Sequence, residues 1–275
     1  SIFERLGGFS NFTLNDIISA NETFKYRNKM EFTFSPNRWV LDHEPECADK
    51  SFALGLHMTG RFDKILNIRN CHLQPEIGNR ILKISRNICL KNPSLKPYNP
   101  KTHIGFLRFL MLRFGINTNQ LMINIVTAYD DLNKLSPLTD ALLDQVPEIT
   151  SMVNNVNTRK ADVAFGEYET LIYGSSTIEE KIGELTFEIS ANSFFQTNTT
   201  QGTMLYKKVK EIADLSGDET IYDLYCGTGT IGLFLSSKAK QVYGFEVIRS
   251  SLENAERNAL KNNIKNVQFQ KANLD

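Results

Sequence analysis

A glycine-rich segment near the end of the chain constrains the fold more than any other feature of the sequence. Asp223–Gly232 reads DLYCGTGTIG and lies where the apolar run Thr220–Tyr225 gives way to a helical pattern. Glycines at such a junction let the backbone approach a ligand closely and adopt positive φ. The carboxyl end of the first strand of a parallel sheet is also where such folds bind their ligands. The segment therefore predicts a nucleotide or nucleoside site.

The residues around this segment alternate between helical and strand patterns. The expected elements are a helix at 199–215, a strand at Thr220–Tyr225, a helix at 230–237, a strand at Gln241–Glu246, a helix at 249–262 and a strand at Val267–Ala272. Such alternation is typical of a doubly wound parallel sheet. We therefore expect residues 191–275 to form an α/β, Rossmann-like domain with three parallel strands.

Residues 1–190 follow a different pattern and are expected to form a mixed domain rich in antiparallel strands, which makes the whole chain α+β. Within Phe24–Phe34, the apolar residues Met30, Phe32 and Phe34 alternate with polar ones, as in a half-buried strand. Further expected elements are strands at Phe52–Met58 and Ile65–Ile68, a hairpin of Leu107–Phe114 with Leu121–Thr127, and helices near 73–92 and 136–146. Ser136-Pro137 predicts the start of the second helix, because proline favours the first helical position.

Charge divides the chain into two unlike parts, although its formal net charge is zero. Residues 1–120 contain 17 Lys and Arg against 10 Asp and Glu, whereas residues 121–275 contain 14 against 21. A basic part suits a polyanion, because phosphate neutralisation supplies much of the affinity for nucleic acid. Nucleic-acid binding by the first domain is therefore expected, with a chance excess of solvated Lys and Arg as the alternative.

Composition and cysteine count exclude several classes of protein. The chain is 41% hydrophobic and 23% charged, as in ordinary globular proteins. No run approaches the roughly 18 apolar residues of a membrane span, and the first residues do not resemble an export signal. We therefore expect a cytoplasmic protein with no membrane partner and no obligate protein partner. Its four cysteines include no CxxC pair, which predicts reduced thiols and no zinc site.

Two acidic residues favour one ligand for the glycine-rich segment. Residues 227–232 fit the GxGxxG pattern of nicotinamide-dependent oxidoreductases, so that class stays open. Asp223, however, would repel a pyrophosphate but could serve the cationic amino-acid part of S-adenosylmethionine. Glu246 ends the next strand and suits ribose hydroxyls in either ligand. We predict S-adenosylmethionine as the cofactor and no catalytic role for Cys226, which belongs to the cofactor loop.

Several segments together resemble the RNA uracil-C5 methyltransferases. They are Tyr26–Phe32 (YRNKMEF), Gly60–Asp63 leading to Cys71, Asn192–Asn198 (NSFFQTN), Asp223–Gly229 (DLYCGTG) and Ala272–Asp275 (ANLD). NSFFQTN followed after about 25 residues by DLYCGTGT is the most specific part. The resemblance covers nearly the whole chain. It implies S-adenosylmethionine-dependent methylation of uridine C5 in structured RNA, either tRNA or rRNA.

The glycine loop and the resemblance together suggest individual binding residues. Those expected at the cofactor are Gln196, Asp223, Tyr225, Gly227, Gly229, Thr230, Glu246 and Asn273. Thr230 departs from the family, in which an asparagine often stands at this position. Gln196 is implied to reach the target uracil as well, and Phe194 is expected to support a base that has left its stack. Candidate phosphate contacts are Arg27, Lys29, Arg61 and Arg108.

The resemblance also implies parts that this sequence does not contain. In the family, a cysteine thiolate adds to uracil C6 and a general base later removes the C5 proton. Both residues are expected beyond Asp275, so we expect no catalytic residue here, a chain that lacks N-terminal and C-terminal regions, and no activity from it alone. Cys71 aligns with the last ligand of an iron–sulfur cluster found in some members. The other three ligands would precede Ser1, so a cluster is expected only in a full-length protein and a buried free thiol within this chain.

Two other functions stay open at this point. A nicotinamide-dependent oxidoreductase would quench NADH fluorescence and would not bind S-adenosylmethionine. A non-catalytic RNA-binding protein with a vestigial cofactor domain would bind RNA without a downstream cysteine and base.

Overall fold

The first part of the chain forms one large sheet covered by two helices. A computed structural model describes residues 2–45, 47–160 and 163–273. The elements of this part are α1 (Ile2–Arg5), β1 (Lys29–Ser35), β2 (Arg38–Trp39), β3 (Ala53–Met58), β4 (Arg61–Asn67), α2 (Glu76–Lys91), β5 (Leu107–Gly115), β6 (Gln120–Thr127), α3 (Leu132–Gln145), β7 (Ser151–Val156) and β8 (Tyr168–Gly174).

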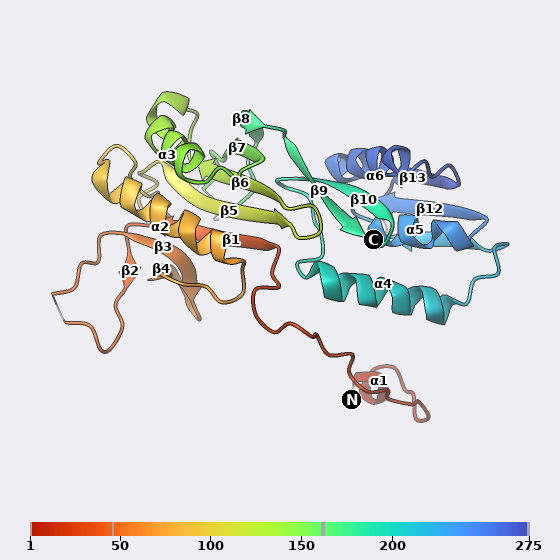
Figure 1. Cartoon of the computed structure of the whole chain (residues 1–275). Coiled ribbons are helices and arrows are strands. Elements are labelled where there is room, and N and C mark those ends of the chain that lie inside the picture. Colours follow the sequence, from red (N-terminus) through yellow and green to blue (C-terminus); the bar gives the residue numbers. More distant parts are fainter. Residues whose placement is uncertain (1, 46, 161–162, 274–275) are drawn as a thin grey trace.

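The large sheet has eight strands in the order β2-β4-β3-β1-β5-β6-β7-β8. Its strand pairs are antiparallel except β2 with β4 and β6 with β7. Helices α2 and α3 lie beside each other over one face of the sheet, whereas α1 lies apart from both sheets (Figure 1). The core between the helices and the sheet is built from buried apolar side chains of β1, β5, β6, α2 and α3.

The alternating pattern at the start of this part correctly predicted a strand. In β1, Met30, Phe32 and Phe34 are buried, and Glu31 between them is exposed. The predicted hairpin is also confirmed, because β5 pairs antiparallel with β6 from Leu107 and Thr127 to Gly115 and Gln120. In β1 every second residue reaches the covered face, which is the periodicity that the sequence displays.

The predicted start of α3 was wrong by one turn. The helix begins at Leu132, where the side chain of Asp131 accepts a hydrogen bond from the Lys134 backbone N–H. Pro137 therefore lies inside the helix and cannot donate to the carbonyl of Asn133. The Ser136 hydroxyl donates to that carbonyl instead, at 3.0 Å. The hydroxyl takes the place of the missing backbone donor, which allows proline beyond the first turn of the helix.

The second part of the chain contains a hairpin and a three-stranded parallel sheet. Its elements are β9 (Thr177–Ile182), β10 (Leu185–Ser190), α4 (Thr199–Ala213), β11 (Thr220–Leu224), α5 (Thr230–Leu235), the 3₁₀ helix η1 (Ser236–Lys238), β12 (Gln241–Glu246), α6 (Arg249–Lys261) and β13 (Val267–Lys271). Strands β11, β12 and β13 pair in parallel in this order. The predicted α/β class with three parallel strands is therefore confirmed, with boundaries within a few residues.

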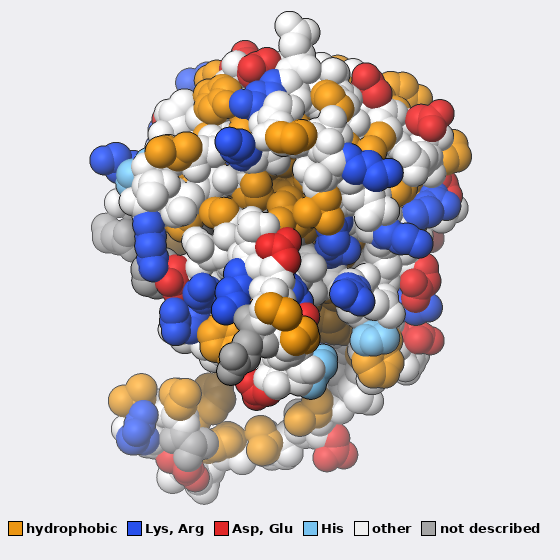
Figure 2. Space-filling model, turned by 90° about the vertical axis from the view of Figure 1, so that its left-hand side faces the viewer, with side chains coloured by type: hydrophobic (Ala, Val, Ile, Leu, Met, Phe, Trp, Pro, Cys, Tyr) orange, Lys and Arg blue, Asp and Glu red, His pale blue; other side chains and the backbone are white. Residues whose placement is uncertain are grey.

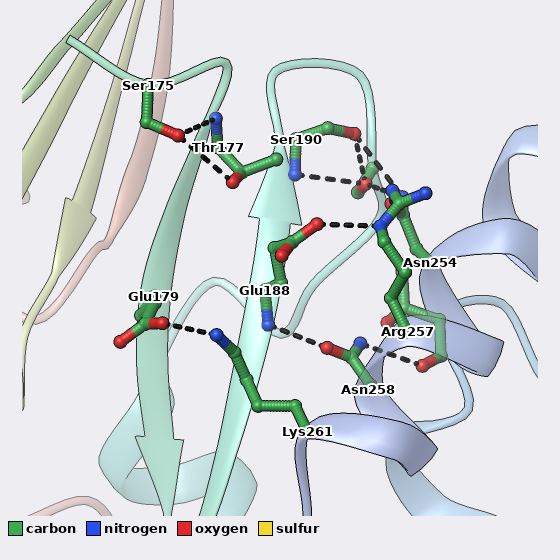
Figure 3. Close-up of polar contacts among 11 residues, drawn as sticks. Ser175, Thr177, Glu179, Glu188, Ser190, Asn254, Arg257, Asn258 and Lys261 are labelled. Carbon is green, nitrogen blue, oxygen red and sulfur yellow. Dashed lines mark hydrogen bonds and ion pairs between the residues drawn. The ribbon is translucent and has the colours of Figure 1, made fainter.

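Polar side chains of helix α6 form hydrogen bonds and ion pairs with the β9–β10 hairpin (Figure 3). The Asn258 side chain accepts a hydrogen bond from the Glu188 backbone N–H at 2.7 Å. Two ion pairs flank this contact, Arg257 with Glu188 at 2.7 Å and Lys261 with Glu179 at 2.5 Å. A side chain of α6 therefore accepts a hydrogen bond from a backbone N–H on the edge of β10 that faces away from β9.

A hydrophobic core runs across the predicted domain boundary at residue 190. Ile178, Ile182, Phe187 and Ile189 of the β9–β10 hairpin are buried with side chains from both parts of the chain. Those partners are Met122 and Val153 of the large sheet, and Ala191, Phe195, Tyr206, Leu233 and Ala259 of the later residues. The hairpin thus packs against side chains that follow residue 190 as well as against the large sheet, so the core does not divide at the predicted boundary.

Among the described residues, the helices are all too short or too polar to cross a membrane.

Candidate functional site

The glycine-rich segment forms a loop at the carboxyl edge of the parallel sheet, between β11 and α5. Tyr225, Gly227 and Gly229 all adopt positive φ, at 60°, 57° and 76°. The Cys226 N–H donates to the Phe245 carbonyl at 2.9 Å and ties the loop to β12. A Cβ built at Gly227 would meet no atom within 4 Å, so the glycine leaves open space beside a strained backbone.

Glu246 holds the loops that follow β11 and β12 together. Its carboxylate accepts from the Gly227 N–H at 3.0 Å, and from the Val247 and Ile248 N–H groups at 2.8 and 2.9 Å. A carboxylate has about four acceptor positions. Three are used by the backbone, so one remains for a hydroxyl of a bound ligand.

Asp223 lies on β11 directly before the loop. Its carboxylate accepts a hydrogen bond from the Gly232 N–H of α5 at 2.9 Å. Burial raises the pKa of Asp223, and the hydrogen bond from Gly232 partly opposes this shift. A charged carboxylate in this position is stabilised by a cationic ligand.

Gln196 connects to the loop through Tyr206 of α4. The Tyr206 hydroxyl lies 3.1 Å from the hydroxyl of Thr230, the first residue of α5. Burial raises the pKa of Tyr206, and its interactions with the side chains of Thr230 and Gln196 oppose the shift. The structure thus joins Gln196 and Thr230, two predicted cofactor residues 34 positions apart, through a residue that the sequence did not single out.

Cys226 is unsuited to act as a nucleophile. Its side chain is buried, and its thiol lies 3.9 Å from the Gly227 carbonyl oxygen. Burial, followed by the charges of Asp223 and Glu246, raises the pKa of Cys226 to about 12. The reactive thiolate is therefore scarce at neutral pH.

The predicted cofactor residues gather at one edge and fit S-adenosylmethionine. Asp223 and Glu246 supply acceptors for a cationic amine and a hydroxyl, and Gly227 leaves room for close approach. The ring of Tyr225 is 66% exposed beside the loop. Asn273 follows β13 and is exposed at the same edge, because the three strands run parallel. Leu274 and Asp275, also part of the recognised motif, lie outside the described residues.

A cavity near β1 brings three predicted substrate residues together. It measures about 380 Å³ and is lined by Arg27, Lys29 and Phe194, among others. Phe194 is 68% exposed, and Lys29 forms an ion pair with Glu31. Burial and then the charge of Arg113 lower the pKa of Lys29. We refer to this space, between β1 and residues 193–197, as the base cavity.

The other two predicted phosphate contacts lie elsewhere, and one of them was wrong. Arg108 of β5 is only 2% exposed. Its guanidinium donates to the Asn157 and Arg159 carbonyls at 2.8 and 2.6 Å and lies over the Tyr98 ring. A phosphate group cannot reach it there. Arg61 is exposed on β4 and paired with Asp63 at 3.2 Å, so its assignment stays a prediction.

Two residues that position the base cavity were missed. Arg113 of β5 is buried and donates to the Ala191 carbonyl at 3.1 Å and to the Ser193 carbonyl. Burial lowers the pKa of Arg113 to about 10, so the side chain stays charged at neutral pH. Asn28 donates to the Gln196 carbonyl and to the Thr199 hydroxyl, each at 2.8 Å. The one available indication was a cation within the apolar run LRFLMLRFG.

Cys71 is a buried free thiol in this structure. Its backbone N–H donates to the Asn79 side chain at 2.9 Å. The described part of the chain contains no group of three or more His, Cys, Asp or Glu side chains that could hold a metal ion. A role for Cys71 in an iron–sulfur cluster stays a prediction.

Comparison with known proteins finds related sequences. An uncharacterized RNA methyltransferase of Chlorobaculum tepidum is 42% identical over 98% of this chain, and one of Porphyromonas gingivalis is 39% identical over 96%. The chain spans 57% and 58% of the length of these two relatives.

A solved structure shares the fold. The Pyrococcus abyssi tRNA (uracil-54, C5)-methyltransferase, in complex with S-adenosyl-L-homocysteine, matches with a TM-score of 0.72 and 27% identity. The match covers 92% of this chain and 57% of the other. The family model described as tRNA (uracil-5-)-methyltransferase matches residues 137–274, which include both NSFFQTN and the glycine loop. By its sequence and its fold, the chain belongs to the tRNA (uracil-5-)-methyltransferase family.

Proposed function

We propose that this protein is an S-adenosylmethionine-dependent methyltransferase that modifies C5 of a uridine in structured RNA, either tRNA or rRNA. One observation carries the proposal. Ser193, Phe194 and Thr197 border the base cavity. Gln196 of the same segment does not line that cavity but interacts with Tyr206, whose hydroxyl contacts Thr230 at the start of α5. A methyl donor and a target base would therefore meet at one stretch of backbone.

On the cofactor side, each proposed role follows from a contact in the loop. Asp223 accepts from the amine of the methionine part, and Glu246 offers its remaining acceptor position to a ribose hydroxyl. Tyr225 and Asn273 bound the place for the adenine ring. When bound, S-adenosylmethionine supplies a methyl group on a sulfonium centre.

On the RNA side, the base cavity suits a nucleotide that has left its stack. Ring stacking on the exposed Phe194 stabilises a flipped base. Arg27 and Lys29 at the rim carry positive charge toward the phosphates on either side of that base. The amide of Gln196 offers both a donor and an acceptor to the uracil edge.

An oxidoreductase function is less well supported than methyl transfer. Asp223 would face the pyrophosphate of a dinucleotide across the glycine loop, and like charges repel there. Both relatives described above are named as RNA methyltransferases. A vestigial cofactor domain is disfavoured because Glu246, Asp223 and the glycine loop together retain a set of polar groups that fits the cofactor.

The decisive experiment follows tritium release from RNA containing 5-tritiated uridine, using the full-length gene product and S-adenosylmethionine. Release at a rate that matches methyl incorporation is expected, because methylation at C5 displaces the proton at that carbon. Methyl incorporation without tritium release would show that the methylated atom is not C5. If neither occurs and the protein binds RNA but not S-adenosylmethionine, the vestigial alternative holds.

A further inference from the structure

Another cavity, far along the large sheet from the cofactor loop, has the charge of an anion-binding site. It measures about 840 Å³ and lies between α2 and the segment from β2 to β4. Its lining contains five cationic side chains, Arg38, Arg69, Arg80, Lys83 and Arg86, against three carboxylates. Figure 2 looks onto this end of the molecule, where Lys and Arg side chains spread across the middle of the face. We call this space the α2 cavity.

The cations of α2 in this cavity form a stripe along one side of the helix. Arg80, Lys83 and Asn87 follow each other at intervals of three and four residues, which places them on the same side. Ile81 and Ile84 between them are buried in the core. The polar side of α2 therefore lines the α2 cavity and is not part of a convex, fully solvated surface.

Three of the five cations form no ion pair within residues 2–45, 47–160 and 163–273, and two of these three, Arg69 and Lys83, are exposed. Arg38 pairs with Glu44, and Arg80 pairs with Glu148. Arg69 and Lys83 are exposed and form no ion pair with any residue in these ranges. An anion that enters the cavity meets both of them without having to displace a carboxylate.

Arg86 adds a third positive charge, which is fixed in place. Its guanidinium donates to the Asn67 side chain at 3.1 Å and to the carbonyls of Leu54 and Ile68. Burial and the charge of Arg69 lower the pKa of Arg86. The two guanidinium groups thus repel each other across the cavity, and an anion between them would relieve this repulsion.

The α2 cavity and the base cavity share the loop between β4 and α2. Arg69 and Asn70 of this loop line the α2 cavity, and Leu73 lines the base cavity. The loop is held to the segment before β1, because the Arg27 N–H donates to the Leu73 carbonyl at 2.8 Å. One loop therefore contributes lining residues to both cavities.

We propose that the α2 cavity binds backbone phosphate groups of the RNA substrate outside the base cavity, with Arg69 and Lys83 as the direct contacts. This inference rests on the proposed function. Guanidinium and ammonium groups are the side chains that bind phosphate most strongly. The exposed amides of Asn70 and Asn87 add donors for phosphate or 2′-hydroxyl oxygens.

The test compares RNA binding by the wild-type chain, the double variant Arg69→Gln/Lys83→Gln and a matched control, Lys240→Gln/Lys265→Gln. The control residues are exposed at the opposite, amino-terminal ends of β12 and β13. Affinity for a structured, uridine-containing RNA is measured from 50 to 200 mM salt. Each phosphate contact contributes roughly 0.7 to 0.9 to the slope of log K against log salt. The cavity variant should have a slope shallower by about 1.4 to 1.8, and the control should match the wild type.

The outcomes separate this inference from the proposed function. If the wild type binds RNA but the slope is the same in the cavity variant, the α2 cavity is not a phosphate site, and the proposed function stands. Loss of affinity for poly-glutamate without a change for RNA would overturn the inference in favour of a protein partner. If the wild type binds no RNA at all, both are overturned. Unchanged binding of S-adenosylhomocysteine and an unchanged melting temperature show that each variant is folded.

Discussion

Burial and the charge of a cationic ligand have opposite effects on the pKa of Asp223. Its pKa is raised by burial, so the ionised form is disfavoured in the free protein. A cationic ligand favours the ionised form and lowers that pKa again. Ligand binding should therefore depend on pH through this one residue.

The first prediction concerns Asp223→Asn. Affinity for S-adenosylmethionine should fall at least tenfold in this variant, because the amine loses an ionic partner, and thermal stability should stay the same or rise. In the wild type, affinity should decline on acidification. The decline should begin at a higher pH than for an exposed aspartate, whose pKa is about 3.9.

Calorimetry between pH 4.5 and 8 provides the measurement, with Asp218→Asn, an exposed residue just before β11, as the control. The variant Asp223→Asn should show little dependence on pH. A pH profile that is the same in both variants would remove Asp223 from the cofactor site.

Arg113 is the residue on which the geometry of the base cavity depends. We predict that Arg113→Lys lowers the free energy of unfolding by about 1 to 3 kcal/mol, because one ammonium cannot replace both guanidinium contacts and a buried carbonyl is left unsatisfied. RNA affinity should also fall, since residues 191–193 lose their support. Urea unfolding and a binding titration measure both effects. Arg69→Lys, at an exposed position, should leave stability within about 0.5 kcal/mol.

At this scale, the sequence indicated the placement of residues at the carboxyl edge of the parallel sheet better than it indicated the burial of the arginines. Asp223, Gly227 and Glu246 are close together in the loops at one edge, as the strand-loop-helix pattern indicated. Arg108 and Arg113 could not be interpreted in the same way. Both are charged residues in a strand buried along its whole length, and only tertiary packing decides whether a cation meets solvent or a buried carbonyl.

Among the elements, helix α6 forms hydrogen bonds along β10 that its amphipathic sequence pattern did not indicate. Its side chains replace a neighbouring strand along β10 (Figure 3). The fully buried Asn258 also donates to the Thr228 carbonyl of the glycine loop at 3.3 Å. One asparagine thus links the hairpin, the helix and the cofactor loop.

We predict that Asn258→Ala lowers the free energy of unfolding by about 1 to 3 kcal/mol, since the Glu188 N–H is left without its acceptor. The affinity for S-adenosylhomocysteine should fall as well, because the loop loses a contact. Glu256→Ala, at an exposed position of the same helix, is the control and should change neither quantity appreciably. Equal stability of the two variants would show that water replaces the asparagine.

Element types were predictable from the sequence wherever hydrophobic periodicity was strong. The strands β1, β5, β6 and β11 to β13 follow the predicted pattern closely. The start of α3 was not predictable, since the bond from the Ser136 hydroxyl to the Asn133 carbonyl exists only once the helix has formed. Proline statistics alone favoured a later start.

For the whole molecule, the core that crosses residue 190 determines which pieces can fold. The hairpin contributes Ile178, Ile182, Phe187 and Ile189 to this core. Burying each such side chain is worth roughly 1.5 to 3 kcal/mol. Their sum is comparable with the total stability of a domain, about 5 to 15 kcal/mol.

We therefore propose that the second domain begins before β9 and not at residue 191. A piece comprising residues 175–275 should unfold cooperatively in urea and give a near-ultraviolet circular dichroism signal. A piece comprising residues 191–275 should show neither property. Cooperative unfolding of the shorter piece would restore the boundary predicted from the sequence.

The segment of residues 193–197 has a further consequence for how the two ligands are bound. Because it borders the base cavity and also connects to the cofactor loop, any shift of its backbone changes both environments at once. The two binding equilibria are then linked, and linkage is reciprocal. If S-adenosylmethionine changes the dissociation constant of the RNA by some factor, the RNA must change that of S-adenosylmethionine by the same factor. The order in which the ligands arrive would thus affect the rate of assembly but not the stability of the ternary complex.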